Sequence, residues 1–274
     1  MSGKWWKTAI NAAVAAMLFT PQLDGHAALR LRPAERGELR LEQNGTPVAD
    51  EQPRFVVQEW QGVATKSATS KNAASKARVG SIVDMPDIKA QLRPLGDGWS
   101  APYELATQRE GDRYVQRWRF ANGITVSALW EQVGDAIRVT GEVMNETPSA
   151  GREEIPISLI LAIPVDEASL EWLADLRRTD SIRGNEEKIS AVPTTAGSRA
   201  AMSRYPFAAV RGKTKCLAVG LPLDSPRIHR VRWDGKHGCL IAEIDVALSS
   251  VPEKFPNRAS FTFWLFDFPR EFGF

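Results

Sequence analysis

The chain has 274 residues, with 35 lysines and arginines against 33 aspartates and glutamates and a formal net charge of +2. A charge this close to neutral excludes the electrostatic attraction that draws basic proteins to nucleic acid or to an anionic membrane. The length suits one large all-β domain or two small ones, and it is ample for a hydrophobic core.

The N-terminus has the pattern of an export signal. Two lysines precede an apolar stretch over 10–19, which is too short to span a bilayer, and small residues over 25–27 offer a cleavage site. The alternative interpretation is a buried N-terminal helix. We expect residues 1–27 to be a signal peptide, so that the mature chain, 28–274, is periplasmic or extracellular. Losing two lysines and one aspartate takes the formal net charge from +2 to +1, and no second segment approaches membrane-spanning length.

The mature chain reads as a series of short strands. Runs rich in β-branched and aromatic residues recur between turn residues, and an Asn-Gly pair at 122–123 predicts a hairpin. This pattern predicts a β-sandwich or barrel, and no repeat or linker divides 28–274, so we expect one domain. The predicted strands cover 38–43, 54–61, 114–120, 125–131, 137–144, 157–163, 207–210, 217–221, 228–233, 240–246 and 260–268.

Alternation along these runs predicts which faces are buried. The run 137–144 is apolar on one face and polar on the other, which is typical of a half-buried strand. The run 260–268 is apolar on both faces, so we expect a central strand that is covered on each side. Two segments do not fit strands: 63–78 reads as a surface loop, and 166–178 reads as a helix or an irregular strand.

The mature chain has two cysteines, Cys216 and Cys239, and export permits a disulfide. If the runs 216–221, 228–233 and 239–246 form a simple meander, the two cysteines lie about 9–10 Å apart across two strand spacings. A disulfide needs Cα atoms within about 7 Å. We therefore favour two buried free thiols, and a different strand order would restore the disulfide.

One hairpin brings acidic and basic side chains together. Glu243 and Asp245 alternate with apolar residues and share one face of their strand, as Arg230 and Arg232 do on the preceding strand. A four-residue loop over 235–238 then sets Arg230 opposite Glu243. The functional interpretation is an acid/base pair tuned by arginines, as in glycoside cleavage. The alternative, which we favour, is a cross-strand salt-bridge ladder on a solvent-exposed face.

Other chemistry has weaker support. His229 is a further acid/base candidate, but the two mature histidines, His229 and His237, lie in a strand and a turn without metal-ligand spacing. We find no phosphate-binding glycine loop and no nucleophile elbow, and we expect no cofactor. Seven tryptophans remain in the mature chain. We expect Trp264 to lie in the core and Trp99, in a Gly-Asp-Gly-Trp-Ser-Ala-Pro segment, to be exposed and able to stack on a sugar ring.

Four segments carry a resemblance to a known family. They are Ser-Arg-Tyr-Pro-Phe at 203–207, Ala-Val-Gly-Leu-Pro-Leu-Asp at 218–224 with Pro-Arg at 226–227, the aromatic strand 261–268, and Glu-Phe-Gly-Phe at 271–274. This quarter of the chain resembles the N-terminal β-sandwich domain of large secreted bacterial glycoside hydrolase-like proteins, which is similar to the galactose-mutarotase supersandwich. The resemblance implies a large antiparallel sandwich with few short helices and a carbohydrate-related setting.

The same resemblance bears on activity. In the relatives, a Gly-Phe like that at 273–274 leads into a larger domain that carries the chemistry, which implies a C-terminal catalytic domain absent here. A mutarotase-like enzyme would need a histidine acid and a glutamate base in one cleft. We therefore expect a non-catalytic, carbohydrate-associated module with a polysaccharide or glycan as partner. The alternatives are a small epimerase or lyase using Glu243, Asp245 or His229, and a structural interaction module whose final strand docks on a protein.

Overall fold

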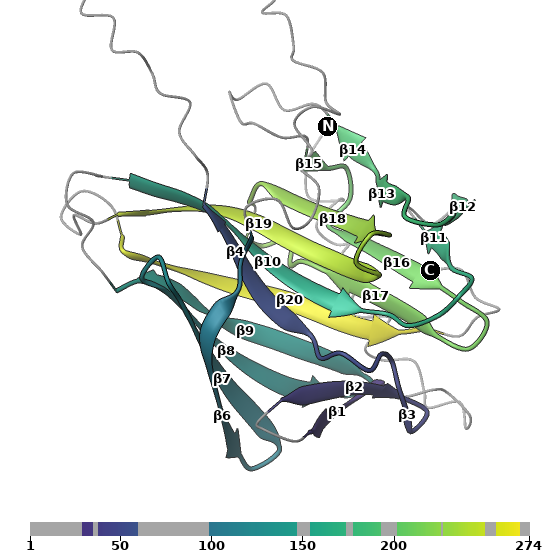
Figure 1. The fold of residues 1–274 in the computed structure, drawn as a ribbon, viewed down its shortest axis with the longest axis horizontal. Coiled ribbons are helices and arrows are strands. Elements are labelled where there is room, and N and C mark those ends of the chain that lie inside the picture. The colour runs from purple at the N-terminus through teal and green to yellow at the C-terminus, as the bar shows by residue number, and fades with distance from the viewer. Residues whose placement is uncertain are drawn as a thin grey trace, which may run out of the picture.

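Two large antiparallel sheets face each other in the computed structural model, and the apolar core lies between them (Figure 1). The structure describes residues 29–34, 38–59, 99–146, 154–173, 178–192, 202–225, 227–249 and 256–268. The predicted signal peptide and the predicted loop over 63–78 lie outside these ranges. The large antiparallel β-sandwich expected from the sequence is confirmed.

The first large sheet has six strands in the order β13-β18-β19-β10-β4-β5. Long central strands pair along most of their length, and β10 with β19 forms the longest ladder. The bounds are β4 at Arg54–Glu59, β5 at Trp99–Ser100, β10 at Glu154–Pro164, β13 at Glu187–Ile189, β18 at His229–Asp234 and β19 at Cys239–Ser249.

The second large sheet has nine strands in the order β12-β11-β16-β17-β20-β9-β8-β7-β6. A turn at 121–123 joins β7 to β8, and Gly123 there has a positive φ of 81°, so the predicted Asn-Gly hairpin is confirmed. The bounds are β6 at Pro102–Glu110, β7 at Arg113–Phe120, β8 at Ile124–Val133, β9 at Ala136–Asn145, β11 at Glu171–Leu173, β12 at Thr179–Ser181, β16 at Phe207–Arg211, β17 at Cys216–Gly220 and β20 at Arg258–Asp267.

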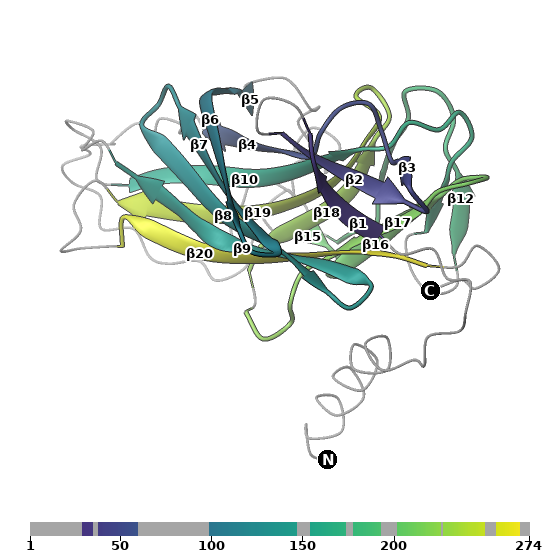
Figure 2. The same cartoon turned by 90° about the horizontal axis from the view of Figure 1, so that it is seen from below.

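Two small sheets complete the described fold; the strands of the first are labelled in Figure 2 and those of the second in Figure 1. The strands β1 (Leu29–Pro33), β2 (Leu39–Gln43) and β3 (Thr46–Pro47) form one of them, and its leucines join the main core. The strands β14 (Ala191–Val192) and β15 (Met202–Ser203) form the other. All eleven strands predicted from the sequence are present, with small differences at their ends.

The described ranges contain no helix, and the helix interpretation of 166–178 is wrong over 166–173. Trp172 packs into the core between the sheets, whereas Leu173 packs on the outer face of the nine-stranded sheet. Neighbouring residues that point to opposite faces define a strand, because a helix would bring them round by only about a quarter of a turn. No helix in the described part has the length and apolar character that a membrane crossing needs.

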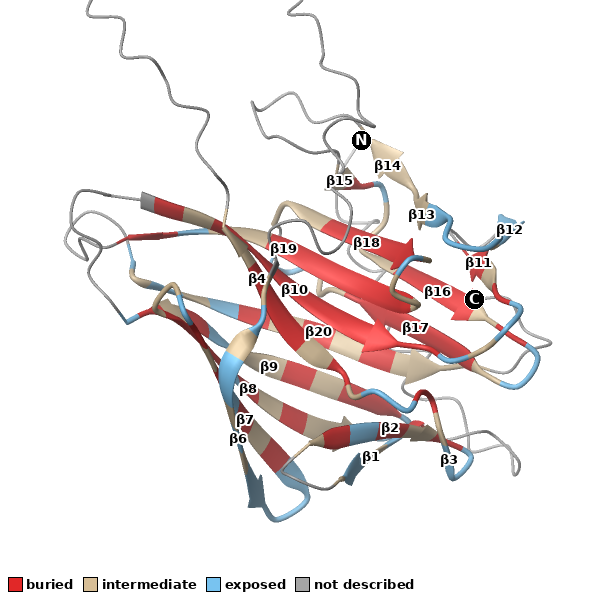
Figure 3. Ribbon diagram, in the orientation of Figure 1, coloured by how far each residue is buried: buried red, intermediate tan, exposed pale blue. Residues whose placement is uncertain are grey.

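Aromatic side chains join the two sheets across the core. Phe55 of β4 lies with its ring centroid 4.9 Å from that of Trp118 and 5.2 Å from that of Phe261, which both belong to the opposite sheet. Such edge and tilted contacts add about 0.5–1.5 kcal/mol each beyond the burial of area. In Figure 3, buried residues alternate with less buried ones along β9, whereas β17 is red throughout because residues of both its faces are buried.

The final strand, β20, has the central position that its sequence predicts. It pairs with β17 on one side and β9 on the other. Its inward side chains, such as Phe263, are fully buried, whereas Trp264 and Phe266 on the outward side are only half-buried. The expectation that Trp264 lies in the core is therefore wrong, because this tryptophan points away from the facing sheet.

The two cysteines are free and buried, as favoured, but the meander used to argue it is wrong. Cys216 begins β17 in the nine-stranded sheet, whereas Cys239 begins β19 in the six-stranded sheet. The chain crosses between the sheets after β17, so the two thiols belong to different layers. The disulfide left open by the sequence does not form.

Candidate functional site: a buried carboxylate–arginine network

The predicted acidic and basic residues meet on the β18–β19 hairpin, in the register expected from the sequence. The turn over 235–238 pairs Asp234 with Cys239, and Arg230 lies opposite Glu243. Because strand side chains alternate, Arg230, Arg232, Glu243 and Asp245 project from the same face of the six-stranded sheet. This is the face turned away from the nine-stranded sheet.

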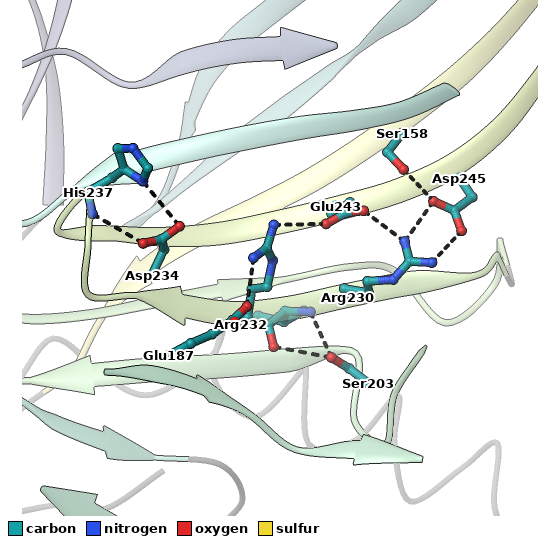
Figure 4. Close-up of polar contacts among 10 residues, drawn as sticks. Ser158, Glu187, Ser203, Arg230, Arg232, Asp234, His237, Glu243 and Asp245 are labelled. Atoms are coloured by element: carbon teal, nitrogen blue, oxygen red, sulfur yellow. Dashed lines mark hydrogen bonds and ion pairs between the residues drawn. The ribbon is translucent and has the colours of Figure 1, made fainter. Parts of the chain in front are cut away.

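Arg230 is the centre of this network (Figure 4). Its guanidinium donates to Glu243 Oε1 at 2.8 Å and to Asp245 Oδ1 and Oδ2 at 2.7 Å each. The bond to Asp245 is therefore bidentate, which is the strongest common form of a charge-assisted hydrogen bond. Ser158 of β10 also donates to Asp245 Oδ1, at 2.8 Å.

Arg232 extends the network towards the sheet edge. Its Nη2 lies 3.4 Å from Glu243 Oε2, and its Nη1 donates to Glu187 Oε1 at 2.7 Å. Neither Ser158 nor Glu187 was identified from the sequence as part of this site. They join it because β10 and β13 flank the hairpin in the sheet, and no local pattern in the chain shows that adjacency.

The expectation of a solvent-exposed ladder is wrong, because the network is buried. The side chains of Arg230, Glu243 and Asp245 are 4%, 7% and 8% exposed. The same face carries Cys239 and Ile241, both fully buried beside Val56, Ile160 and Ala162. The sequence holds the signal that was overlooked: Cys239 and Ile241 alternate in phase with the two acids, so this face is apolar as well as charged.

Burial and pairing oppose each other at these charges. Burial raises the pKa of Asp245 above its ordinary value, and repulsion from Glu243 adds to this, although bonds from Arg230 and Ser158 lower it. Burial alone would lower the pKa of Arg230, but the two carboxylates raise it well above its usual range. The two carboxylates therefore favour the charged form of the arginine despite its burial.

The geometry argues against proton transfer by Glu243 and Asp245. Both oxygens of each carboxylate already face an arginine nitrogen, and the side chains are closed off from solvent. A general acid or base must reach the proton that it moves, directly or through one water. The arrangement holds charges in place and ties β18 to β19 and β10.

His229 does not join the two acids. It lies opposite Ile244 in the hairpin register and so belongs to the core-facing side of β18, with Val231 and Trp233. Its Nδ1 lies 2.9 Å from the carbonyl oxygen of Arg227. The sheet therefore separates this histidine from both carboxylates.

His237 and Trp99 are the other residues considered from the sequence. His237 Nδ1 lies 3.3 Å from Asp234 Oδ2, within the hairpin turn. In the described ranges, no three histidine, cysteine, aspartate or glutamate side chains form a group that could hold a metal ion. The backbone of Trp99 belongs to β5, and its side chain lies outside what the structure describes.

Comparison with known proteins identifies no family. No family model matches the chain, and no curated protein does. Among solved structures, the Slr1438 protein from Synechocystis sp. PCC 6803 matches 86% of this chain and 89% of its own at 12% identity, with a TM-score of 0.37. The GH36 alpha-galactosidase AgaB from Geobacillus stearothermophilus matches 88% of this chain but 32% of its own, at 13% identity and a TM-score of 0.32. Scores this low assign neither a family nor an activity.

Proposed function

We propose that the chain is an exported, non-catalytic β-sandwich module that associates with carbohydrate, and that it accompanies a glycoside hydrolase-like catalytic domain. The observation that carries the non-catalytic part is the bidentate pairing of Asp245 with Arg230, which also binds Glu243, in a buried position. The acid pair best suited to glycoside chemistry is thereby held as a structural ion pair. A glycosidase pair needs one acid that can donate a proton to the leaving group and room for the sugar between the two carboxyls.

The carbohydrate part rests on the family resemblance and on where its segments lie. The segments at 203–207, 218–224 and 261–268 contribute to β15, β16, β17 and β20. Of these, β16, β17 and β20 are consecutive neighbours in the nine-stranded sheet. Most of the described residues that carry the resemblance therefore lie on three neighbouring strands, whereas residues 271–274 lie outside the described ranges.

The test measures binding and cleavage on the same samples. The purified protein is run in native gels containing galactomannan, xyloglucan, hydroxyethyl cellulose, alginate or polygalacturonate, and each polysaccharide is assayed for new reducing ends and new double bonds. We expect retardation by at least one polysaccharide and no cleavage of any. Cleavage that is lost in Glu243→Gln would support the epimerase or lyase alternative, and an absence of all retardation would refute the carbohydrate association.

Export is tested separately. We propose that residues 1–27 are removed during translocation. Expression of the full chain in a bacterium, followed by mass measurement of the periplasmic and secreted protein, gives the N-terminus directly. A protein that stays in the cytoplasm with residues 1–27 attached would contradict this part of the proposal.

A further inference from the structure

Half-buried aromatic side chains gather on the outer face of the nine-stranded sheet. Trp264 and Phe266 point outward from β20, Phe207 points outward from β16, and Tyr205 precedes it. We call these four residues the aromatic platform. They do not contribute to the core between the sheets.

The platform is continuous because a glycine lies within it. Phe207 pairs with Gly220 and Gly220 pairs with Trp264, so the three residues form one row across adjacent strands. A Cβ on Gly220 would lie 3.7 Å from Phe207 Cβ and 3.7 Å from Phe266 Cε1. Side-chain atoms of Phe207 and Phe266 therefore flank the strand where a side chain is missing, and Tyr205 extends the surface with its ring centroid 6.0 Å from that of Phe207.

The spacing of the outer rings suits an extended ligand. The backbones that carry Phe207 and Trp264 lie on either side of β17, two strand spacings apart, which is about 9–10 Å. In the next row of the same face, Ala209 and Ala218 are fully buried, with Phe266 packed against them. An apolar surface of this length can contact more than one sugar ring at once.

Polar side chains continue the same row. Arg138 pairs with Trp264, and its guanidinium lies 5.8 Å from the centroid of the indole ring. It forms an ion pair with Glu131, the next residue in the row. At the other side of the platform, Arg211 Nη2 lies 2.8 Å from Glu171 Oε2. Planar charged groups beside an aromatic ring offer hydroxyl-binding atoms next to a surface that stacks on C–H groups.

The paired charges on the outer face of the nine-stranded sheet are nearly balanced, which favours a neutral ligand over an acidic one. Six arginines on or beside it form ion pairs with five glutamates, so the face has no large excess of positive charge to attract a polyanion. A neutral, polyhydroxylated chain meets both the aromatic surface and the balanced polar groups. These ion pairs are Arg113 and Arg138 with Glu131, Arg117 with Glu146, Arg119 with Glu104, Arg211 with Glu171, and Arg258 with Glu142.

We infer that the aromatic platform is the binding surface for a neutral polysaccharide, with sugar rings stacked on Trp264 and Phe207 and hydroxyl groups bound by Arg138 and Glu131. The inference rests on the proposed function and places its binding surface on the outer sheet face rather than at Trp99. It makes Trp264 the residue that contributes most to binding, because an indole offers the largest stacking face.

The test uses native affinity gels with galactomannan, xyloglucan and hydroxyethyl cellulose as neutral probes, and with alginate and polygalacturonate as acidic ones. Trp264→Leu keeps an apolar side chain on the outer face but removes the aromatic surface. The control is Tyr103→Leu, which makes the same aromatic-to-leucine change at an exposed ring on the edge strand β6, four strands from β20. We expect Trp264→Leu to weaken retardation by a neutral probe at least about tenfold, which corresponds to ~1.4 kcal/mol, and Tyr103→Leu to bind as the original protein does.

A second variant tests the same surface without removing an aromatic ring, in case Trp264→Leu fails to fold. Gly220→Gln adds a long side chain between Phe207 and Trp264 without removing either ring, and it should also weaken retardation by a neutral probe. Gly220→Ala should retain it, since the added methyl group meets only ordinary contacts. Circular dichroism of all variants checks that the sheets are intact.

The outcomes separate this inference from the proposed function. If a neutral probe retards the original protein and Trp264→Leu equally, the platform inference is wrong while carbohydrate association stands. If only acidic probes retard the protein, the choice of a neutral ligand is wrong. If no probe retards it and Trp264→Leu instead converts a dimer into a monomer in size-exclusion chromatography, both proposals fail and the platform is a protein interface.

Discussion

Removing Arg230 exposes what the buried network contributes to stability. Arg230→Met keeps most of the unbranched apolar stem but removes three hydrogen bonds, of 2.8, 2.7 and 2.7 Å, to two buried carboxylates. Breaking a buried ion pair from one side costs about 3–5 kcal/mol, because the partner charge stays buried. In a chain of this length each kcal/mol lowers the melting temperature by about 2–4 °C, so we expect a decrease of about 6–20 °C.

The stability that Arg230→Met loses should depend on pH. Without Arg230, burial and repulsion from Glu243 still raise the pKa of Asp245, and the main group that lowers it is gone. An acid whose pKa is higher in the folded state than in the unfolded state, where it is about 4, stabilises the fold most below that value. This stability is lost as the pH rises through the folded-state pKa. The variant should therefore be destabilised more at pH 8 than at pH 5.

Urea unfolding of both proteins at pH 5 and pH 8, followed by circular dichroism, measures the effect. Arg113→Met is the matched control, since the Arg113 side chain is 55% exposed and its pair with Glu131 should contribute at most about 1 kcal/mol. Adding Asp245→Asn to Arg230→Met should recover part of the lost stability. The reasoning is refuted if Arg230→Met costs no more than Arg113→Met, or if its cost is the same at both pH values.

Three further predictions concern single sites. Gly141→Ala should destabilise the sandwich by at least about 2 kcal/mol in urea unfolding, because its Cβ would clash with the Ser127 carbonyl oxygen; an equal effect of Gly220→Ala, where the nearest atoms are 3.7 Å away, would contradict this. Burial raises the pKa of Asp267 to about 6, so its stabilising effect should be present below about pH 4 and lost as the pH rises through 6. Asp267→Asn should remove about 1–2 kcal/mol of that pH dependence, after allowance for the partial exposure of the side chain. The prediction is wrong if the free energy of unfolding changes equally between pH 4 and pH 8 in the variant and in the original protein. Both cysteines are buried, and burial raises the pKa of the Cys239 thiol to about 12. Ellman's reagent at pH 8 should therefore label neither cysteine in the folded protein and both after denaturation without reductant. If neither is labelled after denaturation, the two cysteines form a disulfide.

Sequence reasoning was most successful where it depended on neighbours along the chain. Strand positions follow from alternation and turn residues, so the eleven predicted strands are present and the hairpin at 122–123 forms. The register that sets Arg230 opposite Glu243 follows from the length of one loop, and it too is confirmed. The edge strand β6 was missed, because Pro102–Glu110 is charged and its residues alternate weakly.

What lies against each face was beyond that reasoning. The order of strands β17, β18 and β19 along the chain suggests a meander, but the chain changes sheet after β17, and nothing local in the sequence shows this. The same limit explains the error about Trp264, which lies on a partly open face although its strand is apolar on both sides. The burial of Glu243 did have a local signal, because the apolar residues Cys239 and Ile241 share its face.

The local geometry of this protein follows from the amino-acid sequence alone: where strands run, which side chains share a face, and that Arg230 lies opposite Glu243. These features depend on backbone alternation and on short loops, which a few neighbouring residues specify. Which faces are covered follows instead from the tertiary structure, because burial depends on strands that are distant in the chain. That coverage gave the arginine–carboxylate network a buried, structural position and left Trp264 with its neighbouring rings on an outer face.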